Sequence, residues 1–220
     1  MALKGAAVLS LPPSRKAPIT LPILTRMFQV LSGWENSLML CSAMSLAFFA
    51  CLRSGEFCVR DPGGFDKDKH LCVGDVKFLG GEMFSLYLKS SKTDTYSTGV
   101  TIFVGCSGGR VCAFCSLKAY LVSRGSPLPF EPLFVDLLGN VLSRAFLVST
   151  VKMLVAILGL EPGDFSGHSF RAGSATTAAA MGFDHWEIKS LGRWTSEAYG
   201  LYIRNPELTA SFAKRLSGNI

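Results

Sequence analysis

Apolar residues recur every three or four positions near the start of the chain, a spacing that places them on one side of a helix. In residues 20–31 they follow an i, i+3, i+4, i+7 pattern, with Thr20 as a candidate N-cap and Gly33 as a candidate stop. Residues 37–52 are apolar almost throughout, which is typical of a helix buried on all sides. The pattern therefore predicts an amphipathic helix followed by a buried core helix.

Two further helices are predicted in the second half of the chain. Residues 112–123 carry apolar positions on one side, and Ser143 can cap a helix over residues 144–158 that Gly159 ends. Residues 125–132 lie between them and contain three prolines, which indicates a loop.

Three short segments between these helices predict strands, at residues 71–78, 83–88 and 100–104. In the second segment the apolar residues occupy every other position, as in a strand with one buried face. Gly80-Gly81 is the signal of a two-residue hairpin between the first two strands. We therefore expect a mainly α fold of the α+β class, with a small three-stranded antiparallel sheet inserted among helices.

The longest apolar run covers residues 38–52 and continues directly into Arg53. It is shorter than the roughly 20 residues that cross a bilayer, so it predicts a buried helix and no membrane partner. Residues 1–17 combine prolines with basic residues and lack the pattern of a signal peptide. We expect a flexible linker over residues 1–17 and one domain over residues 18–220.

The composition adds two constraints. The 220 residues include 22 Lys and Arg against 16 Asp and Glu, and the resulting net charge of +6 suits a polyanion such as DNA without establishing one. The seven cysteines are an odd number scattered through apolar segments, which indicates reduced thiols in an intracellular protein. Cys106, Cys112 and Cys115 include a C-x-x-C pair, but no fourth ligand follows at a familiar spacing. We therefore expect structural thiols and no metal.

The residues with the most chemical content lie in the last third of the chain. His168 and Arg171 are three residues apart and would share one side of a helix, an arrangement that by itself is typical of a structural pair. Small residues follow Arg171, so this helix should pack closely in the core. The combination with a later tryptophan and tyrosine is much rarer. The motifs are Gly167-His168-Ser169-Phe170-Arg171, Leu191-Gly192-Arg193-Trp194 and Tyr202-Ile203-Arg204.

Two other cationic positions stand out earlier in the chain. Arg53 follows the buried apolar helix, where an arginine is costly unless it faces a partner or a site. The simplest interpretation is a surface ion pair with Glu56. Lys89 and Lys92 lie where the second strand turns toward the third, and lysines at such a tip are usually solvated.

Taken together, the His168, Trp194 and Tyr202 motifs resemble the C-terminal half of the catalytic domain of tyrosine recombinases, the phage integrase family. The residues of these motifs are most similar to those of the Crypton and DIRS-type recombinases of eukaryotic mobile elements. The resemblance runs from about residue 18 to about residue 216, and it implies the tyrosine recombinase catalytic fold. In the family a Leu-Arg-x-Gly-Glu segment, here ending at Glu56, supplies a catalytic arginine, and a Lys-Thr dipeptide, here Lys92-Thr93, supplies a lysine.

The resemblance implies a role for each of these side chains. Tyr202 would be the nucleophile, in preference to Tyr199, which lies three residues earlier on the same side of a helix. His168 would act as its base, and Lys92 would protonate the leaving 5′ oxygen. Glu56 would orient the first arginine. The implied catalytic set is Arg53, Lys92, His168, Arg171, Trp194 and Tyr202, and the implied DNA contacts are Arg53, Lys92, Arg171 and Arg193.

The resemblance also implies a reaction and its partners. The reaction is DNA cleavage and rejoining through a 3′-phosphotyrosyl link, which serves recombination and integration of a mobile element and needs no cofactor. The partner would be double-stranded DNA in the nucleus. A homo-oligomer would form through a C-terminal helix with Leu208, Phe212 and Leu216 on one stripe, unless that helix packs on its own domain.

Two other functions remain open at this point. One is a catalytically silent DNA-binding protein, and the other is relaxation of supercoils by type IB topoisomerase-like chemistry. Full recombinases carry an N-terminal helical domain that completes a clamp around DNA, and only about 20 residues precede the predicted domain here. We expect an excised or truncated domain, or a different grip on the DNA.

Overall fold

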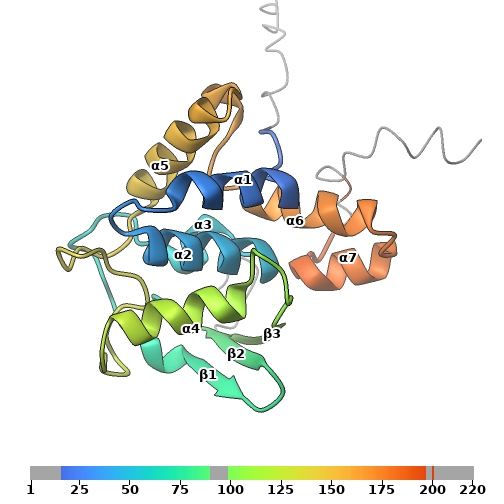
Figure 1. The fold of residues 1–220 in the computed structure, drawn as a ribbon. Coiled ribbons are helices and arrows are strands. Elements are labelled where there is room, and N and C mark those ends of the chain that lie inside the picture. The colour runs from blue at the N-terminus through green and yellow to red at the C-terminus, as the bar shows by residue number, and fades with distance from the viewer. Residues whose placement is uncertain (1–15, 90–98, 197–199, 201–220) are drawn as a thin grey trace, which may run out of the picture.

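The computed structural model describes residues 16–89, 99–196 and 200 of the chain. Within them the elements follow the predicted order of helices, a small sheet and more helices (Figure 1). The α-helices are α1 (Leu21–Leu31), α2 (Ser37–Phe49), α3 (Ser54–Phe57), α4 (Ala113–Ser123), α5 (Arg144–Ile157), α6 (Ser169–Ala180) and α7 (His185–Gly192), the strands are β1 (Val76–Leu79), β2 (Met83–Leu88) and β3 (Val100–Gly105), and single 3₁₀ turns cover Val73–Asp75 and Pro162–Asp164.

Helix α2 is the centre of the core, as its apolar sequence predicted. Nearly every residue from Met39 to Phe48 is buried, because α1, α4 and α6 pack around it. Figure 1 shows α2 between α1 and α4, with the sheet beyond α4. The amphipathic prediction for α1 is also confirmed, with Leu24, Met27 and Leu31 fully buried.

The end of α2 differs from the prediction. The helix stops at Phe49 instead of continuing to residue 52. Cys51 adopts a left-handed backbone conformation with φ of 49°, which a continuing α-helix cannot contain. The Leu52 amide instead donates to the carbonyl of Ala47 at 2.9 Å. This tight turn directs the chain from α2 into Arg53 and α3.

The three strands form one antiparallel sheet in the order β1-β2-β3. The alternation in β2 is confirmed, since Phe84, Leu86 and Leu88 point into the core and are at most 1% exposed. The hairpin prediction was wrong in length: Leu79 pairs with Met83, so three residues connect β1 to β2. Positive φ values at Gly81 and Glu82 complete this longer turn.

The first strand is also shorter than predicted. Residues 73–75 form a 3₁₀ turn, and the carboxylate of Asp75 accepts the amide of Cys72 at 2.7 Å. A carboxylate that binds the backbone three residues earlier competes with strand pairing, which explains why β1 starts at Val76.

Side-chain capping was predicted well for α5 and not for α1. The hydroxyl of Ser143 accepts the amide of Phe146 at 3.1 Å, whereas Thr20 makes no capping hydrogen bond with its side chain. At α4 the cap is the sulfur of Cys112, which accepts the amide of Cys115.

Helix α6 is buried along most of its length, as its small residues predicted. Its Gly173 lies against the backbone of Ile19, and a Cβ built at this glycine would overlap the Ile19 carbonyl. The amide of Ile19 donates to the carbonyl of Ser169 at 2.8 Å. The segment before α1 therefore runs directly along α6, and only a glycine permits that approach.

Several predictions fall on residues outside the described ones. They are most of the linker at residues 1–17, Lys92, Tyr199, Tyr202 and the C-terminal helix with its stripe of Leu208, Phe212 and Leu216. Among the helices that the structure describes, none has the length and apolar character to cross a membrane.

Candidate active site

The turn after α2 gathers arginines from distant parts of the chain. The carbonyl oxygen of Cys51 accepts hydrogen bonds from Nη1 of Arg171 at 2.6 Å and from Nη2 of Arg193 at 3.4 Å. The neighbouring carbonyl of Ala50 accepts Nη1 of Arg193 at 2.9 Å. Carbonyls at the C-terminus of a helix lack helical donors and carry partial negative charge, so they are natural acceptors for guanidinium groups.

Glu56 joins two of the three arginines of this cluster. Its Oε1 lies 2.9 Å from Nη1 of Arg53, and its Oε2 lies 3.1 Å from Nη2 of Arg193. Oε2 also accepts the backbone amide of Arg53 at 2.8 Å. The side chain of Glu56 is 4% exposed, whereas those of Arg53 and Arg193 are 19% and 16% exposed. The interpretation of Arg53 and Glu56 as a surface ion pair was therefore wrong, because α7 brings Arg193 over the carboxylate.

Arg171 is the most deeply buried member of the cluster, with 2% of its surface exposed. Burial lowers the pKa of its guanidinium to about 10, and the charges of Arg53 and Arg193 contribute in the same direction, while Cys51 opposes them. The group is still cationic at neutral pH. Three cations thus gather around one buried carboxylate and the carbonyls at the end of α2, and such a site attracts an anion such as a phosphate.

Trp194 covers one face of Arg171. The guanidinium carbon lies 4.2 Å from the ring centroid, a cation–π contact, and Nη2 donates to the carbonyl of Gly192. A Cβ on Gly192 would lie 1.6 Å from the Trp194 ring, so no side chain fits there. Helix α7 ends at Gly192, because Arg193 takes a left-handed conformation with φ of 55°. That turn folds Trp194 back over Arg171.

His168 lies at the start of α6 as its N-cap residue, and its side chain is exposed. The prediction that His168 and Arg171 are one helical turn apart is consistent with this position, but the two side chains differ sharply in burial. Gly167 packs against Ser54, the first residue of α3, where a Cβ would approach the serine side chain to 2.7 Å. The turn that carries His168 is thereby held beside the segment that carries Arg53.

Lys89 is held by protein partners and is not solvated, as a lysine at the tip of a turn would usually be. Its Nζ lies 2.6 Å from the carboxylate of Asp75 and donates to the carbonyls of Lys67 and His70 at 2.7 and 3.0 Å. Burial lowers the pKa of Lys89, but the hydrogen bonds to Asp75 and Cys72 outweigh it and raise the pKa above its ordinary value. A lysine held by four partners is a poor proton donor. Lys92 and Tyr202 lie outside the described residues, so their roles stay predictions.

Sequence reasoning missed the acceptors that organise this site. The carbonyls of Ala50, Cys51 and Gly192 hold Arg171 and Arg193, and a backbone carbonyl gives no signal in a sequence. Arg193 was expected to contact DNA, and the structure shows it also ties α7 to the end of α2. Its Nε is buried without a hydrogen-bond partner among the described residues, which leaves one donor for a ligand.

Glu56→Gln tests whether this carboxylate holds the cluster together. The substitution keeps the shape but removes the carboxylate charge that offsets Arg53 and Arg193. We expect the free energy of unfolding to fall by about 3 kcal/mol, since removing one partner of a buried ion pair leaves the other charge uncompensated. Urea denaturation measures this. Glu131→Gln is the control, because Glu131 pairs with Arg124 at 37% exposure and should change stability by less than about 1 kcal/mol. Equal losses in both variants would contradict the central position of Glu56.

Comparison with known proteins identifies structures that share this fold. No protein-family model and no curated protein sequence matches this chain. Among solved structures, the chain is similar to the XerH site-specific recombinase bound to its difH substrate, with 16% identity and a TM-score of 0.62 over 97% of this chain and 57% of that one. The XerA recombinase gives 14% identity and a TM-score of 0.63 over 94% and 66%. A lambda integrase dimer bound to a COC′ core site gives 17% and 0.58 over 88% and 49%.

The chain thus spans about half to two thirds of the length of these structures. Identities this low establish the fold alone. The seven helices and the three-stranded antiparallel sheet of the described residues form the integrase-like fold of tyrosine recombinase catalytic domains, as the sequence predicted.

Proposed function

We propose that this chain cleaves and rejoins strands of double-stranded DNA through a 3′-phosphotyrosyl intermediate, in site-specific recombination. The observation that carries the proposal is the convergence of Arg53, Arg171 and Arg193 at the end of α2. Guanidinium groups bind the two non-bridging oxygens of a phosphodiester in a fork geometry that lysine cannot match. The shared fold supports the same function, because the XerH and lambda integrase structures contain their DNA sites.

In the proposed reaction each side chain of the site has a defined role. The phenol oxygen of Tyr202 attacks the phosphorus while His168 accepts its proton, since a free phenol with a pKa of about 10 is a weak nucleophile at neutral pH. The bond from phosphorus to the 5′ oxygen breaks, and the 5′ oxygen takes a proton from Lys92. The arginines stabilise the charge on the phosphorane. A 5′ hydroxyl from another strand reverses the steps, so the link conserves the bond energy and no cofactor takes part.

In this proposal the phosphate takes over hydrogen bonds that the DNA-free protein makes internally. Arg171 donates to the carbonyls of Cys51 and Gly192, and Trp194 covers its face. A phosphate that enters beside Trp194 offers stronger, charge-assisted acceptors than these carbonyls. The buried Nε of Arg193, which has no partner among the described residues, supplies one further donor. The indole N–H of Trp194 can donate to the phosphate but cannot exchange protons.

The internal bonds of Arg171 also favour a second candidate function. A guanidinium whose two terminal nitrogens donate to carbonyls, at 2% exposure, fits a DNA-binding protein without catalysis equally well. Covalent trapping separates the two functions, because only the enzyme leaves a phosphotyrosyl adduct. Relaxation of supercoiled DNA without recombinant products would indicate topoisomerase-like chemistry instead.

We further propose an origin in a eukaryotic mobile element of the Crypton or DIRS type, with action in the nucleus. This proposal is supported by the amino-acid sequence of the motifs at His168, Trp194 and Tyr202, which resembles that of those recombinases. Sequencing of the DNA recovered in covalent adducts would identify element ends or a cellular target.

Assembly on DNA is proposed to involve the C-terminal tail of a second copy. The stripe of Leu208, Phe212 and Leu216 needs an apolar receptor. A cavity of about 460 Å³ lies among α1, α2, α6, the connection from α6 to α7, the end of α7 and the loop before α4. The cavity is lined mainly by apolar side chains, among them Leu21, Phe48, Phe49, Ala178, Phe183 and Leu191. Deleting residues 206–220 should reduce assembly in gel-shift assays more than cleavage of a nicked substrate. Equal loss of both would show that the tail packs on its own domain.

Arg53→Ala and Arg171→Ala test the proposed phosphate site. Each variant should cleave a nicked duplex, built from DNA recovered in adducts, about 10²–10³ times more slowly than the wild type, the usual effect of one lost donor to a developing anion. Arg60→Ala is the control, since Arg60 is exposed and near Arg53 in sequence. Circular dichroism must show all three variants folded. Cleavage by either site variant within about tenfold of wild type would contradict its assignment.

The identity of the nucleophile is the last prediction of this function. A nicked substrate that loses its 5′ fragment traps the covalent enzyme, and mass spectrometry of the digested protein locates the nucleotide-bearing peptide. We expect the adduct on Tyr202 and its absence in Tyr202→Phe, because the family nucleophile is often followed by Ile-Arg. Tyr199→Phe is the matched control and should still trap. An adduct on Tyr199, or trapping by Tyr202→Phe, would overturn the assignment.

A further inference from the structure

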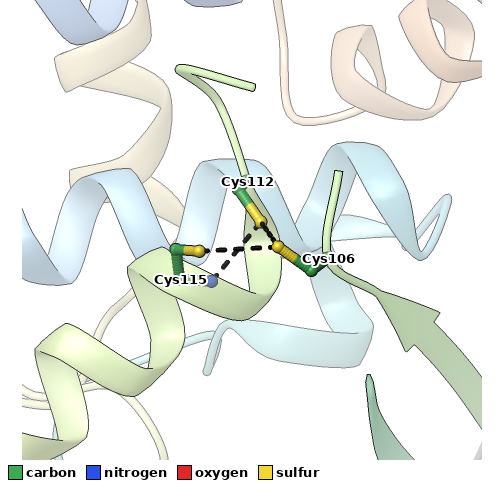
Figure 2. Close-up of side chains that lie close together, drawn as sticks. All are labelled: Cys106, Cys112 and Cys115. Carbon is green, nitrogen blue, oxygen red and sulfur yellow. Dashed lines mark hydrogen bonds between the residues drawn. The ribbon is translucent and has the colours of Figure 1, made fainter. Parts of the chain in front are cut away.

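Three cysteines that are separated in sequence converge at one place on the surface. Cys106 follows the last residue of β3, Cys112 is the N-cap of α4, and Cys115 lies in the first turn of that helix. The sulfur of Cys106 is 3.6 Å from that of Cys112 and 3.7 Å from that of Cys115 (Figure 2). All three sulfurs lie within 4.8 Å of one another. The sequence offered only a C-x-x-C pair, and the fold adds the third thiol.

These two separations match sulfurs that share a metal ion. A tetrahedral zinc ion with Zn–S bonds of about 2.3 Å holds its sulfurs about 3.8 Å apart. A disulfide requires about 2.05 Å, so bonding Cys106 to either of the other two would need a movement of more than about 1.5 Å. The arrangement is therefore close to a ligand set and distant from a disulfide.

The loop between Cys106 and Cys112 is held in this shape by its own hydrogen bonds. The hydroxyl of Ser107 donates to the carbonyl of Val111 at 2.8 Å and accepts the amide of Gly109 at 3.3 Å. A left-handed Gly108, with φ of 64°, closes the turn. A preformed loop brings the sulfurs together before any ion binds, which reduces the entropy that binding must overcome.

The surroundings of Cys112 favour a thiolate. Its sulfur accepts two backbone amides, from Ser107 at 3.3 Å and Cys115 at 3.4 Å, and it lies at the positive end of α4. A metal ion binds the thiolate form of cysteine, so this geometry suits Cys112 as a ligand.

The other four cysteines behave as the structural thiols that the sequence predicted for all seven. Cys41 is half-buried, and Cys51, Cys58 and Cys72 are buried. Burial raises the pKa of Cys41 to about 11, and it raises the pKa of Cys51 and Cys58 as well. None of these four belongs to a cluster of potential ligands among the described residues. The surface cluster is therefore chemically distinct.

We propose that Cys106, Cys112 and Cys115 bind a zinc ion as three thiolates, with a water in the fourth position. Thiolates select soft ions of this kind. Among the described His, Cys, Asp and Glu residues, no fourth side chain joins the three sulfurs. Cys115 is exposed and Cys106 is half-buried, so the remaining position opens to solvent. Binding releases the thiol protons, which makes zinc affinity fall as the pH falls.

The ion would brace the fold at a useful place. It joins the end of β3 to the start of α4, and α4 packs along α2, whose last turn holds the arginine cluster. The strand β3 also follows the connection that carries Lys92 in the sequence. The zinc site is independent of the proposed function, because its test needs no DNA and no cleavage.

The experiment measures metal binding by the full chain. Protein purified in reductant and freed of metal by a chelator is titrated with Co²⁺ and then with Zn²⁺. We expect about one ion per chain, with tetrahedral visible bands and sulfur-to-cobalt charge transfer that zinc abolishes. Cys115→Ser should bind zinc at least about tenfold more weakly than the wild type. Because Cys115 is exposed, this substitution should leave the fold intact. Cys41→Ala, a half-buried cysteine outside the cluster, should bind like the wild type.

Other results would overturn the proposal. One is the absence of cobalt charge transfer in a folded, fully reduced wild type. Another is equal binding by wild type and Cys115→Ser. A third is a disulfide that joins Cys106 to Cys112 or Cys115 in freshly purified protein, detected as a loss of two hydrogens by mass spectrometry without reductant. Chelation followed by thermal unfolding gives an independent readout, because an ion that binds only the folded chain must raise its melting temperature.

Discussion

The structure depends on how three guanidinium groups are accommodated at the end of a buried helix. A cation inside a protein is strongly destabilising unless hydrogen-bond acceptors or opposite charges surround it. Here the turn after α2 supplies the acceptors, because the left-handed Cys51 leaves two carbonyls available, and α3 supplies the opposite charge through Glu56. Arg171 on α6 and Arg193 at the end of α7 are both hydrogen-bonded to this turn. The same contacts therefore determine both the packing of the core and the positive charge of the site.

The same arrangement explains the small residues around the site. Gly192 leaves room for the ring of Trp194, and the left-handed Arg193 folds that ring onto Arg171. Gly167 permits the turn before α6 to lie against Ser54. A side chain at Gly192 would overlap the ring of Trp194, and one at Gly167 would overlap the side chain of Ser54. Positive charge is thereby concentrated at a fixed place, which is the property that a phosphate-binding site requires.

The cysteine cluster is related to this centre through packing alone. It joins the end of β3 to α4, and α4 covers the side of α2 opposite α1 (Figure 1). An ion there would join the end of the sheet to the helix that packs on α2. The arginine cluster and the proposed zinc site would thus hold the core at two places by different chemistry.

The sequence by itself determined most of the local structure. The pattern of the apolar residues placed α1, α2 and α4 within a few residues, the cap at Ser143 placed α5, and the alternation in Phe84, Leu86 and Leu88 gave the buried face of β2. These patterns are local, so a short window of residues contains them. The errors came where a side chain or an unusual φ overrode the pattern, as at Asp75, Glu82 and Cys51.

The motifs also indicated which residues carry chemistry, but only the tertiary structure decided what holds them. The partners of Arg171 are carbonyls of Cys51 and Gly192, and backbone acceptors have no signature in a sequence. Glu56 meets Arg193 because the residue that caps the end of α7 lies beside α3, a contact between segments more than 100 residues apart. Cys106 joins the C-x-x-C pair because β3 ends beside α4. Local sequence determines the secondary structure and the side chains of each segment, whereas burial of apolar surface across the whole chain decides which segments come into contact.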